Sequence, residues 1–134
     1  MHWMLDGTLQ NYPQQLQGLV ERAGPLAVPG AYNPMAALMA RDVGFDALYF
    51  SGAAFSAGLG IPDIGIFTLD QLTQAVRDVV RASGLPVIVD AGVGTASDAT
   101  IAMEIGADGG LMNSAIAGAK NPVAMATAMR RVIL

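Results

Sequence analysis

Residues 85–95, with the sequence LPVIVDAGVGT, constrain the fold of this chain more than any other stretch. The run VIV at 87–89 is apolar on both faces, which is typical of a strand in a parallel sheet that helices cover. The run ends in the carboxylate of Asp90, and a glycine-rich turn then leads into a helix. Functional groups in such sheets gather at the carboxyl ends of the strands. The stretch therefore predicts a parallel sheet with a site at the edge where Asp90 lies.

Strands and helices alternate about four times along the 134 residues. Two junctions are alike, because in both 44–51 and 106–113 a glycine ends a helix, a short acidic turn follows, and a buried strand ends in a small polar residue. Such alternation is typical of parallel βα units with right-handed crossovers. A complete eight-unit barrel needs about 200 residues or more. We therefore predict an α/β fold, a parallel (βα)4 half of a TIM-type barrel, with strands at 26–28, 47–51, 87–89 and 110–113.

Local signals indicate where the helices begin and end. Asn33 and Asn121 each precede a proline, a favoured N-cap followed by a favoured first helical residue. Thr68 and Gln71 form a capping box, and Gly84 ends that helix. We predict a loop of small residues at 52–65 and further helices at 14–23 and 97–105. The apolar residues expected to face the core from the helices are Leu38, Met39, Val43, Leu69, Leu72, Val76, Val79, Val80, Val123, Met125, Ala126, Met129 and Val132.

The chain carries few charges for its size. Charged residues make up 13% of it, where about 25% is usual for soluble domains, and the mean hydropathy is +0.46. Half a barrel also leaves two strand edges unpaired, and such edges are paired or covered in native proteins. We therefore predict a homodimer or a higher homo-oligomer that completes or covers the half-barrel.

Composition disfavours several classes of function. The net charge of −4 and the single lysine, Lys120, disfavour binding to nucleic acid or to an anionic membrane. The sequence has no cysteine, which excludes disulfides and thiol catalysis, and no apolar run reaches the length of about 18 residues that suggests a membrane span. Residues 1–13 show no signal-peptide pattern and are predicted to be a leader without regular structure, before a domain at 14–134 with a cytoplasmic location. The one histidine, His2, lies in this leader, so a Ser/His/Asp set is not expected.

Four ordered motifs lie between residues 27 and 90, namely PGAYN at 29–33, ALYFSGAA at 47–54, GIPDIG at 60–65 and LPVIVD at 85–90. With them, the segment from about 18 to 90 resembles the isocitrate lyase/phosphoenolpyruvate mutase superfamily, especially its methylisocitrate lyase-like members. The resemblance implies that Tyr49, Ser51, Gly52 and Ala53 bind a substrate carboxylate. It also implies that Asp63 and Asp90 help to organise a magnesium site. The family's second aspartate is Gly92 here, and its catalytic cysteine or lysine motif is missing.

A second set of motifs runs from Pro86 onward: PVIVDAGVGTASDA at 86–99, AMEIGADG at 102–109 and MNSAIA at 112–117. These residues resemble the last quarter of thiazole synthase, a βα barrel of thiamine biosynthesis. The resemblance implies that Ala91 and Gly92 after one strand, and Asn113 and Ser114 after the next, hold a sugar phosphate. It also implies a Schiff-base lysine in a segment that this sequence does not contain. The single lysine of this sequence, Lys120, lies elsewhere, just before a helix cap.

The two resemblances overlap at residues 86–90, and we therefore predict an artificial or recombined chimera of a part at 14–90 and a part at 86–134. We expect it to fold and self-associate without catalysis. One alternative is a module that binds phosphate, sulfate or a sugar phosphate, and another is a residual magnesium-dependent lyase or phosphonomutase. No cofactor is expected, apart from weak magnesium binding at Asp63 and Asp90. Each site residue also has a structural explanation, because turns and helix caps use the same residue types.

Overall fold

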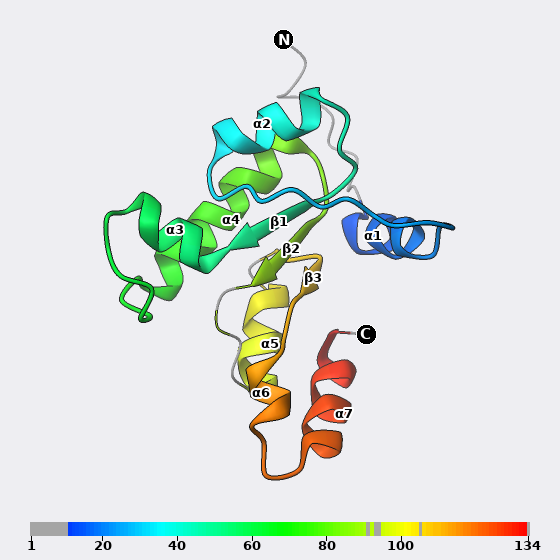
Figure 1. The fold of residues 1–134 in the computed structure, drawn as a ribbon, viewed down its shortest axis with the longest axis vertical. Coiled ribbons are helices and arrows are strands. Elements are labelled where there is room, and N and C mark those ends of the chain that lie inside the picture. The colour runs from blue at the N-terminus through cyan, green and yellow to red at the C-terminus, as the bar shows by residue number, and fades with distance from the viewer. Residues whose placement is uncertain (1–10, 91, 93–94, 105, 134) are drawn as a thin grey trace.

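The computed structural model describes residues 11–90, 92, 95–104 and 106–133. Its centre is a three-stranded parallel sheet in the order β1-β2-β3, which confirms the α/β class with a parallel sheet (Figure 1). The strands are β1 (Leu48–Ser51), β2 (Val87–Asp90) and β3 (Gly109–Gly110). The helices are α1 (Tyr12–Val20), α2 (Pro34–Asp42), α3 (Gly52–Gly58), α4 (Leu69–Ser83), α5 (Ala96–Glu104), α6 (Ser114–Ala117) and α7 (Pro122–Ile133).

The strand predicted at 26–28 is not formed. Instead, an extended segment meets β1 through a single parallel bridge between Gly30 and Tyr49. There the Tyr49 N–H donates to the Pro29 carbonyl oxygen at 3.0 Å, and the Ala31 N–H donates to the Tyr49 carbonyl oxygen at 2.8 Å. Pro29 has no N–H of its own, which weakens a longer ladder at this position. The last predicted strand, at 110–113, is the two-residue β3.

One face of the sheet forms the main core. Leu48 and Phe50 of β1 and Val87 and Val89 of β2 are almost fully buried against α2 and α4. The capping box at the start of α4 is confirmed, and Gly84 ends the helix with a φ of +65°, a left-handed conformation that suits glycine. Of the predicted core residues of α4, three are buried, Leu72, Val76 and Val79, whereas Leu69 is exposed.

The opposite face of the sheet is covered at its amino-terminal end by α1. Leu16 and Leu19 of α1 are buried there and form a second, smaller cluster with Ala47, against which Ile88 packs. The helix begins at Tyr12 and ends at Val20, so it starts inside the predicted leader and is shorter than the prediction at its far end. The rest of the leader, residues 1–10, lies outside the described residues.

The start of α2 is as predicted, but two other predictions about helices are wrong. The Asn33 cap of α2 is confirmed, because its Oδ1 accepts from the Ala36 N–H at 2.9 Å. However, small Ala37 and Ala40 face the core, and Met39 and Val43 are exposed, since α2 packs closely against its neighbours through its alanine side. The segment 52–65 is not a loop throughout, because Ser51 caps α3 within it.

The carboxyl-terminal helices α5, α6 and α7 pack chiefly on one another (Figure 1). The predicted cap of α7 is confirmed, since Asn121 Oδ1 accepts from the Ala124 N–H at 3.0 Å. Met129 is buried as predicted, but Val123 near the start of α7 is exposed. Among the described helices, none is both long and apolar enough to cross a bilayer.

Candidate functional site

A hollow of about 480 Å³ opens at the carboxyl ends of β1 and β2. The parallel register places Ser51, the last residue of β1, opposite Asp90, the last residue of β2. The segment after α3 returns over this edge and supplies the far wall. Most of the residues predicted from the sequence line this hollow, namely Tyr49, Ser51, Gly52, Ala53, Asp63, Asp90 and Gly92.

Tyr49 and Asp90 are joined by a hydrogen bond within the hollow. The Tyr49 hydroxyl donates to Asp90 Oδ2 at 2.6 Å. The hydrogen bond to Asp90 raises the pKa of Tyr49 above its ordinary value, and burial and the negative charge of Asp90 act in the same direction. The Ser51 hydroxyl lowers the pKa of Tyr49 in part. The Tyr49 hydroxyl therefore keeps its proton at neutral pH and acts as a hydrogen-bond donor.

Ser51 and Gly52 begin α3. The Ser51 hydroxyl oxygen accepts from the Ala54 N–H at 3.2 Å, and Gly52 is buried. The structural explanation of Ser51 as a helix cap is thus realised. The Ser51 side chain also borders the hollow, so the cap and a contact with a ligand are compatible.

Asp63 faces the hollow from the turn that follows Pro62, and Gly65 continues that turn with a φ of +71°. Asp63 and Asp90 give the wall two carboxylates, and among the described residues no lysine, arginine or histidine lines it. Magnesium prefers about six oxygen ligands, and one Asp90 oxygen already accepts from Tyr49. In the part of the chain that the structure describes, no three acidic, histidine or cysteine side chains form a metal cluster. The two carboxylates therefore fit Mg²⁺ only together with water or ligand oxygens.

The residues predicted to hold a phosphate are brought together less closely. Gly92 is exposed, has a φ of +69° and borders the hollow. Asn113 and Ser114 follow β3, the neighbour of β2, so they lie beyond the same edge of the sheet, but they do not line the hollow. Asn113 precedes α6 without a capping bond from its side chain. Ala91 lies outside the described residues.

The sequence did not point to two apolar residues of the site, Ile64 and Phe67, which also line the hollow. Phe67 packs edge-on against Phe55 with ring centroids 5.3 Å apart, and Phe55 in turn lies 5.6 Å from Phe50 in the core. This row of rings connects the far wall of the hollow to β1. The aromatic residues at 50, 55 and 67 were the available signal, but their spacing fits no single helix or strand.

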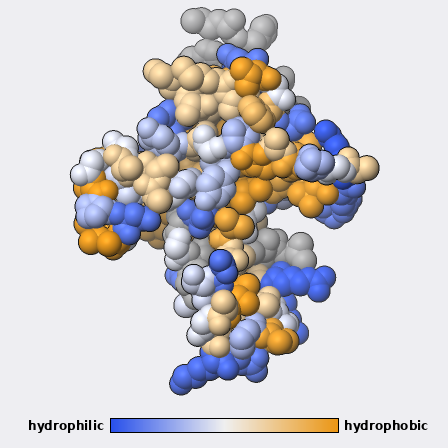
Figure 2. Space-filling view, viewed as in Figure 1, coloured by the Kyte–Doolittle hydropathy of each residue, from blue (hydrophilic) through white to orange (hydrophobic). Residues whose placement is uncertain are grey.

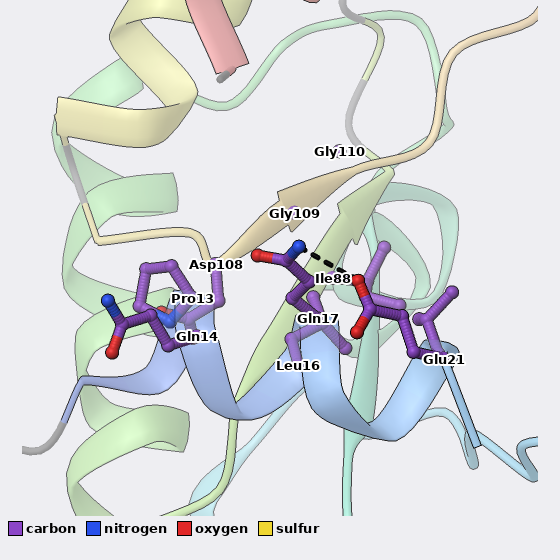
Figure 3. Close-up of a pocket in the computed structure, with 10 residues that line it drawn as sticks. Pro13, Gln14, Leu16, Gln17, Glu21, Ile88, Asp108, Gly109 and Gly110 are labelled. Atoms are coloured by element: carbon purple, nitrogen blue, oxygen red, sulfur yellow. Dashed lines mark hydrogen bonds between the residues drawn. The ribbon is translucent and has the colours of Figure 1, made fainter.

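A second hollow, of about 520 Å³, lies between α1 and the start of β3 (Figure 3). Leu16, Ile88 and Gly109 line it, and Gln17 Nε2 donates to Glu21 Oε1 at 2.9 Å along its rim. None of the predicted site residues borders it. The hollow at the carboxyl ends of the strands is therefore the candidate site.

Parallel strands that bury one face under helices and carry polar groups at their carboxyl ends define an α/β protein with a parallel sheet. A crystal structure of phosphonopyruvate hydrolase in complex with oxalate and Mg²⁺ matches this fold with a TM-score of 0.72 and 23% sequence identity. The match covers 92% of this chain and 50% of that chain. The two chains thus share the same α/β architecture over nearly the whole length of this one.

Within this class, the chain belongs to the family described as thiazole biosynthesis protein ThiG, whose model matches residues 26–134. Thiazole synthase from Maricaulis maris (strain MCS10) is 40% identical over 131 residues, which cover 92% of this chain and 45% of that protein. 2-Methylisocitrate lyase from Bacillus subtilis (strain 168) is 40% identical over 98 residues, which cover 70% of this chain and 32% of that protein. The chain therefore spans less than half the length of these relatives.

The prediction of an artificial chimera without function is wrong. Both predicted likenesses are found, but the thiazole family model begins at residue 26 and runs without a break through the expected junction at 86–90. It thus includes most of the part assigned to the lyase family alone. Short strand and turn motifs recur in different α/β families, so such a motif does not by itself identify one family.

Proposed function

We propose that this chain acts in thiazole biosynthesis, as a part of a barrel that binds a sugar phosphate. The family match over residues 26–134 is the observation that carries the proposal. The relative from Maricaulis maris, a thiazole synthase, supports it over nearly the whole chain. Because the chain spans less than half of that relative, the proposal concerns the binding and orientation of the ligand.

The arrangement of the strand ends supports a phosphate site. Gly92 follows β2, and Asn113 and Ser114 follow β3, the strand paired with β2. Backbone N–H groups in such turns bind phosphate oxygens without any basic side chain. The carboxylates in the neighbouring hollow would then contact the remainder of the ligand.

The covalent step implied by the family resemblance is not assigned to this chain. Lys120 lies four residues before Ala124, in the turn that leads into α7, and its side chain is exposed and does not line the hollow. A Schiff base needs a lysine whose amine is held beside the ketone of the ligand. The residues of this chain therefore bind and orient the sugar phosphate.

We also propose that a second copy of the chain completes the half-barrel. The described sheet has three strands, and its last strand, β3, is two residues long. Apolar side chains gather over α2 on the face that Figure 2 shows. Three large apolar residues of α2, namely Met35, Leu38 and Met39, are exposed, as is its C-cap residue Val43. A closed assembly would remove unpaired strand edges and cover apolar surface.

Titration of the ¹⁵N-labelled chain with ribose 5-phosphate tests the binding function. We expect the amide signals of Gly92 and Asn113 to shift, whereas the signal of Gly84, at the end of α4, serves as an internal control. The same titration with inorganic phosphate locates the phosphate subsite. Unmoved signals at Gly92 and Asn113 with millimolar ligand would rule out the proposed function.

A further inference from the structure

We propose that Tyr49 is a positioning residue, whose hydroxyl holds one oxygen of Asp90 so that the other oxygen accepts a hydroxyl group of the bound sugar phosphate. This inference rests on the proposed function. It identifies the part of the ligand, other than the phosphate, that this chain recognises.

The sheet itself sets the geometry of the pair. Tyr49 lies opposite Ile88 in the register of β1 and β2, and Asp90 is two residues further along the same face of β2. Such diagonal neighbours in a sheet lie within reach of an aromatic side chain. The Tyr49 hydroxyl covers this distance and donates to Asp90 Oδ2 at 2.6 Å.

The hydrogen bond gives Tyr49 and Asp90 different roles toward a ligand. A phenol hydroxyl can donate one hydrogen bond, and the Tyr49 hydroxyl donates it to Asp90. Tyr49 therefore has no second hydrogen bond to donate to a ligand. Within the described residues, no second partner bonds the Asp90 carboxylate, so Oδ1 is available. A fixed carboxylate oxygen accepts a hydroxyl proton more effectively than a freely rotating one, because less conformational entropy is lost on binding.

The charge of the hollow favours a hydroxyl group over a free anion. Asp63 and Asp90 line it, and no basic side chain does so within the part of the chain that the structure describes. A phosphate dianion in direct contact with these carboxylates would be repelled, whereas a hydroxyl would donate a charge-assisted hydrogen bond to one of them. Gly92 borders the same hollow two residues after Asp90. A phosphate at Gly92 would thus leave the carbon chain of the ligand beside Asp90.

Calorimetric titrations with glycerol 3-phosphate and inorganic phosphate, at one pH and one ionic strength, test this inference. We expect wild-type protein to bind glycerol 3-phosphate more tightly than inorganic phosphate. Tyr49→Phe should reduce this preference about tenfold by weakening glycerol 3-phosphate alone. Tyr32→Phe is the matched control, because the Tyr32 ring lies against Gly58 and does not line the hollow.

The outcomes separate the inference from the function on which it rests. A Tyr49→Phe protein that keeps the wild-type preference would overturn the role of Tyr49 and leave the sugar-phosphate function standing. Wild-type protein that binds neither compound would overturn both. Circular dichroism checks that Tyr49→Phe folds. If it does not fold, Asp90→Asn takes its place, with a reduced preference supporting the inference and an unchanged preference overturning it.

Discussion

The Val87 N–H donates a hydrogen bond of 2.9 Å to Asp108 Oδ2, and the Asp108 N–H donates back to the Val87 carbonyl oxygen at 3.0 Å. This reciprocal pair joins the start of β2 to the turn that begins β3. Burial raises the pKa of Asp108 to about 6, from an ordinary value of 3.8, and the hydrogen bond from Val87 lowers it in part. The contact between β2 and β3 therefore depends on a carboxyl group that titrates just below neutral pH.

Acidification is expected to stabilise the fold through Asp108. Because its pKa is higher in the folded protein, the folded state holds the proton more tightly, and this stabilisation is complete below about pH 3.8 and lost as the pH rises through about 6. Asp108→Asn keeps an oxygen for the Val87 N–H and removes the charge. At pH 7 it should raise the free energy of unfolding by about 1 kcal/mol, a value that allows for solvent screening of a partly exposed group.

Urea unfolding of wild-type and Asp108→Asn protein at pH 5 and pH 7 checks this expectation. The two proteins should differ more at pH 7 than at pH 5. Asp46→Asn is the control, since Asp46 is an exposed partner of Arg22. An equal difference at both values would show that Asp108 does not control the pH dependence.

Removal of the Asp90 charge is expected to alter the ionisation of Tyr49. In Asp90→Asn, the pKa of Tyr49 should fall toward its ordinary value of 10.0, because its largest cause, the hydrogen bond to Asp90, is weakened. Ultraviolet titration of the phenols measures the change, with Tyr49→Phe used to assign the signal. Asp63→Asn should leave the pKa of Tyr49 nearly unchanged, because Asp63 makes no hydrogen bond to it.

Two buried serines should respond oppositely to replacement by alanine. Ser56 is 1% exposed, and its hydroxyl has no hydrogen-bond partner among the described residues. Ser56→Ala should therefore raise the free energy of unfolding by about 1 kcal/mol. Ser83 donates to the Val79 carbonyl oxygen at 2.9 Å and accepts from the Leu85 N–H at 3.2 Å, so Ser83→Ala should lower it by about 1 kcal/mol. Thermal melts of both variants measure these changes in stability. A lower stability of Ser56→Ala would reveal a further hydrogen-bond partner of the Ser56 hydroxyl.

Self-association should depend on concentration and on the exposed side of α2. Light scattering at two protein concentrations should give a mass that approaches twice the chain mass of 13.8 kDa at the higher one. Met39→Glu places a charge on the exposed apolar surface of α2 and should shift the mass toward the monomer. A monomeric mass at both concentrations would refute completion by a second copy.

Features that depend on neighbours in the sequence were predictable. The caps at Asn33 and Asn121 and the capping box at Thr68 each need residues at most three positions apart. The strand at 87–90 was evident because each of its residues is apolar until Asp90. Local chemistry therefore located most elements, whereas most of the candidate site residues were expected from the family resemblances.

Features that depend on contacts across the fold were not predictable from the sequence alone. Tyr49 and Asp90 are 41 residues apart, and their hydrogen bond exists because of the strand register. The orientation of α2 was missed because close packing selected Ala37 and Ala40 over larger residues nearby. Phe67 joined the site through contacts between rings that no sequence period encodes.

The outward-facing side of α2 carries two thioethers, those of Met35 and Met39, whereas the thioether of Met129 is almost fully enclosed. Brief treatment with hydrogen peroxide should convert the first two to sulfoxides well before the third. Peptide mapping of the treated protein then works as a footprint of α2. Slow oxidation at Met35 and Met39 would reveal that another molecule shelters this helix, without any crystal or any mutation.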